Sequence, residues 1–181
     1  MLLALDISTS CTGYCLFDED KLVDIGNINL SKHKGLFEKA SRVKEAITEL
    51  KHLYSITHVA VEENLQAFRP GLSSAKTLMT LAQFNGVVRW ICHEILKVPV
   101  EAINVNTARK SVGLKIDKKD KSKTTKEKVL DWVTADNPSI KWPTKILKSG
   151  PNKGKNRICN EAYDMADAYV IGKSFLVENI K

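Results

Sequence analysis

The chain has 181 residues, of which 43% are hydrophobic, and this length and composition suit one compact domain over 1–181 with its own core. No apolar run approaches the roughly 20 residues of a membrane span, and Met1 leads into apolar residues without a charged leader, so we expect a soluble, intracellular protein. The net charge of +7 excludes a strongly acidic protein and favours polyanionic partners.

The first third of the chain predicts a sheet that is covered by a helix. Alternating and continuous apolar runs predict strands at 2–8, 13–17, 22–30 and 58–64. Between the last two strands, apolar residues recur at spacings of three and four over 37–53, which is typical of an amphipathic helix packed on a sheet.

The rest of the chain predicts mainly helices. One helix runs from Ser73 or Ser74 to Leu96, and a strand follows at 100–105. Further helices are expected at 106–113, 124–134 and 160–177, whereas 137–156 holds three prolines and two glycines and is predicted to lack regular structure. This order of elements predicts an α/β fold with a mixed five-stranded sheet flanked by helices.

The positive charge is concentrated in a basic segment at 115–157. This segment holds 13 of the 28 Lys and Arg residues but only 5 of the 21 Asp and Glu residues. Such a concentration on an otherwise nearly neutral chain predicts a binding surface for a polyanion such as nucleic acid. The alternative interpretation is that this segment is a solvated, lysine-rich surface without a binding role.

Acidic residues stand at three places where apolar neighbours predict burial. Asp6 lies inside the first apolar strand, and Glu62 and Glu63 end a later one. Asp164 and Asp167 share one face of the last helix. Singly, these acids have ordinary explanations as turn caps or exposed strand ends. Together, they are expected to converge at one edge of the sheet, where carboxylates repel unless cations compensate, and an oxygen-only set fits Mg²⁺ or Mn²⁺.

Three motifs resemble the RuvC-type Holliday junction resolvases, which have an RNase H-like fold. The stretch from Asp6 to Tyr14 is similar to their first strand and turn, Asp-Pro-Gly-Ser-x-x-Thr-Gly-Tyr. Residues 60–62, Ala-Val-Glu, resemble their second acidic strand, Ala-Ile-Glu, and 164–168 resemble their closing Asp/His-x-x-Asp-Ala helix. The order and separation of the motifs agree along nearly the whole chain.

The resemblance implies a metal-dependent DNA endonuclease that resolves four-way junctions in DNA recombination and repair. It assigns Asp6, Glu62, Asp164 and Asp167 to two Mg²⁺ ions, for which Mn²⁺ would substitute, and leaves Glu63 as a neighbour. A family lysine implicated at the active site is matched by Lys126. The expected partners are branched DNA and a second copy of the chain, in the cytoplasm of a bacterial or virus-infected cell or in another DNA-containing compartment.

Contacts with DNA are expected from basic and aromatic side chains on both sides of the acidic site. The predicted DNA-binding residues are Lys115, Lys118, Lys119, Lys121, Lys123, Phe68, Arg69, Lys145, Lys148, Lys153 and Lys155. The dimer is expected to form through the helix ending at Leu96, whose apolar residues exceed what one helix face buries on its own sheet: Leu78, Leu81, Val88, Trp90, Ile91 and Ile95.

Departures from the family pattern leave other functions open. Ser8 replaces a glycine and Ser10 a common arginine, and Leu65 stands where many relatives have an aromatic wedge, which Phe68 would have to replace. The alternatives are a general flap or branched-DNA endonuclease and a catalytically silent DNA-binding protein of the same fold. The actin-like and sugar-kinase ATPases share the opening strand, but 181 residues with 9 glycines leave little room for their second lobe. Cleavage preference and strict junction selectivity are not determined by the sequence.

Overall fold

The computed structural model describes residues 1–63, 74–117 and 119–179. Within these residues, five strands form a sheet in the order β3-β2-β1-β4-β5. The strands are β1 (Leu2–Ile7), β2 (Cys11–Asp18), β3 (Lys21–Asn29), β4 (His58–Glu62) and β5 (Val100–Ile103). The first three strands pair antiparallel, whereas β4 pairs parallel to both β1 and β5. The predicted mixed five-stranded sheet is therefore confirmed.

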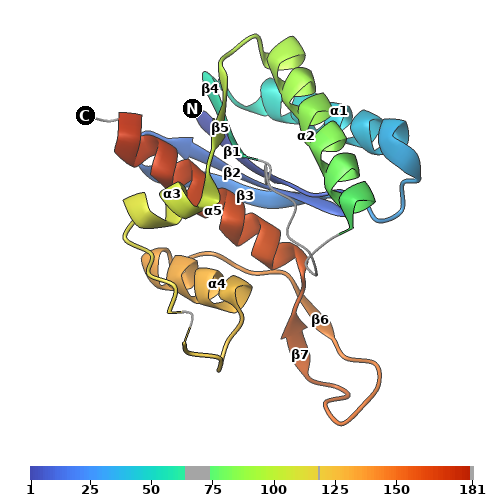
Figure 1. The fold of residues 1–181 in the computed structure, drawn as a ribbon, viewed down its shortest axis with the longest axis vertical. Helices are drawn as coiled ribbons and strands as arrows, with labels where there is room; N and C mark the ends of the chain where they lie inside the picture. Colours follow the sequence, from blue (N-terminus) through green and yellow to red (C-terminus); the bar gives the residue numbers. More distant parts are fainter. Residues whose placement is uncertain (64–73, 118, 180–181) are drawn as a thin grey trace.

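Helices cover both faces of this sheet (Figure 1). On one face lie α1 (Gly35–Leu53) and α2 (Ala75–Leu96), and on the other lie α3 (Val105–Ser111), α4 (Thr125–Asp136) and α5 (Glu161–Asn179). Because β1 is covered on both faces, all six of its residues are buried, and this explains its unbroken apolar run. No helix in the described ranges is both long and apolar enough to span a bilayer.

Local signals set the ends of two helices. The Ser74 hydroxyl accepts the Thr77 N–H at the start of α2, as the sequence predicted for one of its two candidate caps. Thr124 and Glu127 form a reciprocal capping box at the start of α4, in which each side chain accepts the other residue's backbone N–H.

The prediction of no regular structure at 137–156 is wrong in part. The strands β6 (Thr144–Ile146) and β7 (Asn156–Ile158) pair antiparallel into a hairpin that projects from the N-terminal end of α5 (Figure 1). The three prolines of 137–156 lie at positions 138, 143 and 151, outside β6 and β7, so they remove no hydrogen bond from the ladder. The prediction considered the prolines and glycines of the whole stretch together, and it therefore overlooked this short ladder.

Candidate active site

Two carboxylates lie side by side where β1 and β4 end. The pairing of Leu5 with Val61 places Asp6 next to Glu62 in the sheet. Ala4 and Ala60, which stand two positions before Asp6 and Glu62, pack in the core on the α5 side of the sheet. Since strand side chains alternate, Asp6 and Glu62 point to that face and Glu63 points away from it. Glu63 accepts a hydrogen bond from the Asn104 amide at 3.2 Å.

Two more carboxylates come from the first turns of α5. Asp164 and Asp167 are three positions apart and lie on the helix face that packs on the sheet, with 9% and 7% of their surface exposed. Gly13 in β2 permits this approach, because a Cβ there would lie 2.1 Å from the Asp164 backbone oxygen. Gly13 therefore sets the distance between α5 and the sheet.

All four carboxylates line one cavity of about 280 Å³, together with two cationic side chains. The Lys126 Nζ lies 3.2 Å from the Asp164 Oδ1, and the Arg109 Nη2 lies 3.3 Å from the Asp167 Oδ1. The remaining lining residues are Ile7, Ser8, Glu63, Leu81 and Asn85. The structure thus brings together every residue that the sequence analysis assigned to catalysis.

Arg109 is a member of this site that the sequence analysis missed. Its side chain is only 20% exposed, and its Nε is buried without a hydrogen-bond partner among the described residues. The sequence offers little to find it by, because α3 has seven residues and Lys110 follows directly. A mostly buried guanidinium that lines a carboxylate cavity and keeps an unused donor is suited to a negatively charged ligand.

The electrostatics of the cavity disfavour four negative charges. Burial raises the pKa of Asp6 well above its usual value, and the neighbouring Glu62, Asp167 and Asp164 raise it further. Burial also raises the pKa of Asp167 to about 6, although Arg109 opposes the shift. For Asp164, burial raises the pKa and Lys126 lowers it, with a net rise. The repulsion that remains is of the kind that a bound cation relieves.

The donor set fits a hard divalent cation. It consists of carboxylate oxygens, which Mg²⁺ and Mn²⁺ prefer. In the positions that the described residues take, no three His, Cys, Asp or Glu side chains are gathered around one point at which they would hold an ion. Two of the four carboxylates are instead paired with Lys126 and Arg109.

Comparison with solved structures identifies the fold. Over 97% of this chain, the structure matches Thermus thermophilus RuvC in complex with a Holliday junction substrate, with a TM-score of 0.64, 18% identity and 92% of that chain covered. A second T. thermophilus RuvC structure matches with a TM-score of 0.59, 18% identity and coverage of 97% and 93% of the two chains. The chain has the RuvC fold. The yeast mitochondrial Holliday junction resolvase Ydc2 also matches, with a TM-score of 0.55, 12% identity and coverage of 97% and 77%.

These likenesses are structural, since no family model and no curated protein sequence matches the chain. They confirm the predicted RNase H-like architecture of the RuvC fold.

The predicted DNA-binding lysines lie in two exposed places on this RuvC fold. The first group lies between α3 and α4, and consists of Lys115, Lys119, Lys121 and Lys123. The second lies on the hairpin, and consists of Lys145, Lys148, Lys153 and Lys155. Lys123 is also paired with Asp131 at 2.7 Å. The predictions for Lys118, Phe68 and Arg69, and for the wedge at Leu65, lie outside the described residues.

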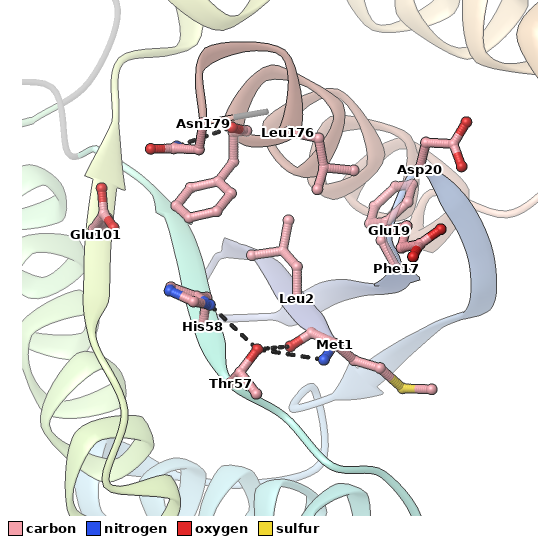
Figure 2. Close-up of a pocket in the computed structure, with 11 residues that line it drawn as sticks. Met1, Leu2, Phe17, Glu19, Asp20, Thr57, His58, Glu101, Leu176 and Asn179 are labelled. Carbon is pink, nitrogen blue, oxygen red and sulfur yellow. Dashed lines mark hydrogen bonds between the residues drawn. The ribbon is translucent and has the colours of Figure 1, made fainter. Parts of the chain in front are cut away.

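A larger cavity among the described residues lies elsewhere. It has a volume of about 790 Å³ and lies at the opposite end of the sheet, where β1 and β4 begin (Figure 2). Leu2, Phe17 and Leu176 contribute apolar surface, while Glu19 and Glu101 lie at its margins. None of the predicted site residues lines it, so size alone does not locate the candidate site in this fold.

Proposed function

We propose that this protein is a divalent-metal-dependent, structure-selective endonuclease that resolves four-way DNA junctions. The observation that carries the proposal is the shared cavity of Asp6, Glu62, Asp164 and Asp167, with Lys126 and Arg109 at their side, in a chain with the RuvC fold. One structural neighbour was solved in complex with a Holliday junction substrate, and another is a Holliday junction resolvase. These two likenesses support branched DNA as the substrate class.

The four carboxylates would hold two Mg²⁺ ions, or Mn²⁺ in their place. When bound, such ions supply an activated water and stabilise the leaving oxygen of a phosphodiester. Asp6 would hold these ions together with the other carboxylates, because its charge interacts with Glu62, Asp167 and Asp164 alike.

The two cationic side chains would act on the scissile phosphate. Burial alone would lower the pKa of Lys126, but the Asp164 carboxylate beside it leaves that pKa raised, so the ammonium stays charged. Lys126 and Arg109 then offer positive charge where the negative charge of the transition state develops. Arg109 additionally has its unpartnered Nε to donate.

A matched pair of adjacent glutamates tests this assignment. Glu62→Gln removes a carboxylate on the α5 side. Glu63→Gln makes the same chemical change at a residue that also borders the cavity, but whose side chain leaves the strand on the opposite face and accepts from Asn104. With Mg²⁺ and a labelled four-way junction, we expect the first variant to lose cleavage and the second to retain it. Cleavage by Glu62→Gln at the rate of Glu63→Gln and of the wild type would show that the Glu62 carboxylate is not part of the reaction centre.

Resolution by paired nicks also calls for two active sites, and we propose a symmetric homodimer. Part of the predicted interface needs correction, because Val88 and Ile91 are buried in the chain's own core. The exposed large apolar residues on α2 are Met79 and Trp90, 65% and 62% exposed and three helical turns apart. They form the stripe that a second copy would cover.

Trp90→Glu tests the homodimer. The variant should sediment as a monomer and convert a supercoiled cruciform plasmid to singly nicked circles, whereas the wild type should give linear product. A wild-type protein that remains monomeric on a junction would overturn the dimer but leave the nuclease assignment standing.

A further inference from the structure

The hairpin formed by β6, β7 and the turn between them carries charge of one sign. From 137 to 160, the chain holds six Lys or Arg residues and no Asp or Glu. Apart from the half-buried Leu147, every residue from 144 to 157 is exposed. The hairpin is closed at its base by the Cys159 N–H, which donates to the Pro143 carbonyl at 2.8 Å. It is therefore a defined ribbon with a basic surface.

The two faces of this ribbon differ. Lys145 lies directly opposite Arg157, and two positions further along, Leu147 is bonded to Lys155. The three cations therefore share one face, while Ile146, 64% exposed, lies on the other. Like charges directly opposite each other destabilise a pair of strands. A polyanion bound to that face would relieve the repulsion between these like charges.

The base of the hairpin adjoins the candidate active site. β7 leads within three residues into α5, which carries Asp164. Arg157 also lies near the first turn of α4: the pKa of Glu127 there is lowered mainly by hydrogen bonds from Thr124, and Arg157 contributes through its charge. Lys126 immediately precedes Glu127, so the basic face of the hairpin begins at the margin of the carboxylate cavity.

The hairpin and the segment between α3 and α4, which carries Lys115, Lys119, Lys121 and Lys123, form separate projections (Figure 1). A straight duplex follows a single line, whereas two helical arms diverge from a branch point. The paired residues from 143 to 147 span about 13 Å, a length of duplex that carries roughly eight phosphate charges. The ribbon is thus long enough for several phosphate contacts.

From these observations we propose that the Lys145, Lys155 and Arg157 face of the hairpin binds the phosphate backbone of a second duplex arm, next to the arm that is cut. This inference rests on the proposed nuclease function and adds to it the element that distinguishes branched from linear DNA. The hairpin makes the affinity for branched DNA exceed the affinity for a duplex of the same sequence.

The test compares a synthetic four-way junction with a linear duplex of one arm-pair sequence, by fluorescence anisotropy in EDTA, where no cleavage occurs. In Lys145→Gln/Arg157→Gln, the loss of two phosphate contacts should weaken junction binding about 30-fold at 0.15 M salt and reduce the salt slope by about 1.8. Binding to the duplex should weaken less than about threefold.

Two control variants separate this effect from general loss of charge or shape. Lys21→Gln/Lys44→Gln removes the same charge from exposed positions on β3 and α1, and Ile146→Gln changes the opposite face of the ribbon. Both should bind the junction as the wild type does. Thermal unfolding of each variant confirms that it is folded.

An equal loss on junction and duplex, or no loss on either, would overturn the second-arm proposal. Cleavage by the wild type in Mg²⁺ is measured on the same DNAs. If the wild type cleaves none of them, the nuclease function fails; if it cleaves and the hairpin variant binds like the controls, only the role of the hairpin fails.

Discussion

Removing one charge from the carboxylate cavity should make the metal-free protein more stable while it abolishes cleavage. Asp167 is the position at which the size of this effect can be calculated, because its side chain is 9% exposed and its pKa is raised from 3.8 to about 6. Asparagine has nearly the shape of the neutral acid. Asp167→Asn therefore replaces an ionised group that the fold disfavours with a neutral one.

The shift of about two pKa units corresponds to about 3 kcal/mol of stability at pH 7, with the attraction of Arg109 already included in the shift. For a chain of this size, 1 kcal/mol moves the Tm by roughly 2 to 4 °C, so Asp167→Asn should raise the Tm by about 6 to 12 °C. Because the folded pKa lies above the unfolded one, this gain is complete above about pH 6 and vanishes as the pH falls to about 4.

The assay is thermal unfolding in EDTA between pH 4 and pH 8, with Asp20→Asn at the exposed β2–β3 turn as a control that should change little. Added Mg²⁺ should stabilise the wild type through binding to the folded state and should stabilise the variant less. A variant that is less stable than the wild type at pH 7.5, or whose gain does not depend on pH, would refute the account of the cavity electrostatics.

Three further substitutions probe the same site. Asp6→Asn should abolish Mg²⁺-dependent cleavage of a four-way junction while gel-shift affinity persists, and cleavage at the wild-type rate would contradict its proposed role as a metal ligand. Lys126→Ala should slow single-turnover cleavage by roughly 10²-fold through loss of transition-state charge, whereas an unchanged rate would leave it a surface partner of Asp164. Gly13→Ala should lower the Tm markedly, because its Cβ would lie 2.1 Å from the Asp164 backbone oxygen; a wild-type Tm would mean that α5 shifts without cost.

Much of the fold could be predicted from periodicity, because the stronger patterns here coincide with burial. The continuous apolar run of β1 reflects the fact that helices cover both faces of this strand. Ser74 caps α2 because its hydroxyl accepts a hydrogen bond from a backbone N–H of the first turn. The hairpin was not predicted because a ladder of three residue pairs is too short to show a clear alternation of apolar and polar residues. Nearly all of its strand residues are also exposed, so burial imposes no such alternation.

The candidate site was predicted less evenly. Asp6 and the α5 acids stand out because charged residues are rare among apolar neighbours. Alternation alone could not choose between Glu62 and Glu63, since the choice depends on the register of β4 against β1. Arg109 could not be distinguished from Lys110, because a seven-residue helix has too few turns to show which side faces the sheet.

The most direct test of the central claim is a cleavage map. Wild-type protein is incubated with Mg²⁺ and, separately, with EDTA, on end-labelled four-way junction, flap, linear duplex and RNA–DNA hybrid substrates, and the cut positions are read on sequencing gels. The account predicts metal-dependent nicks at symmetry-related positions in two strands of like polarity of the four-way junction, with little cutting of the linear duplex or the hybrid. Cleavage of the flap in preference to the junction, or no metal-dependent cleavage of any substrate, would contradict it.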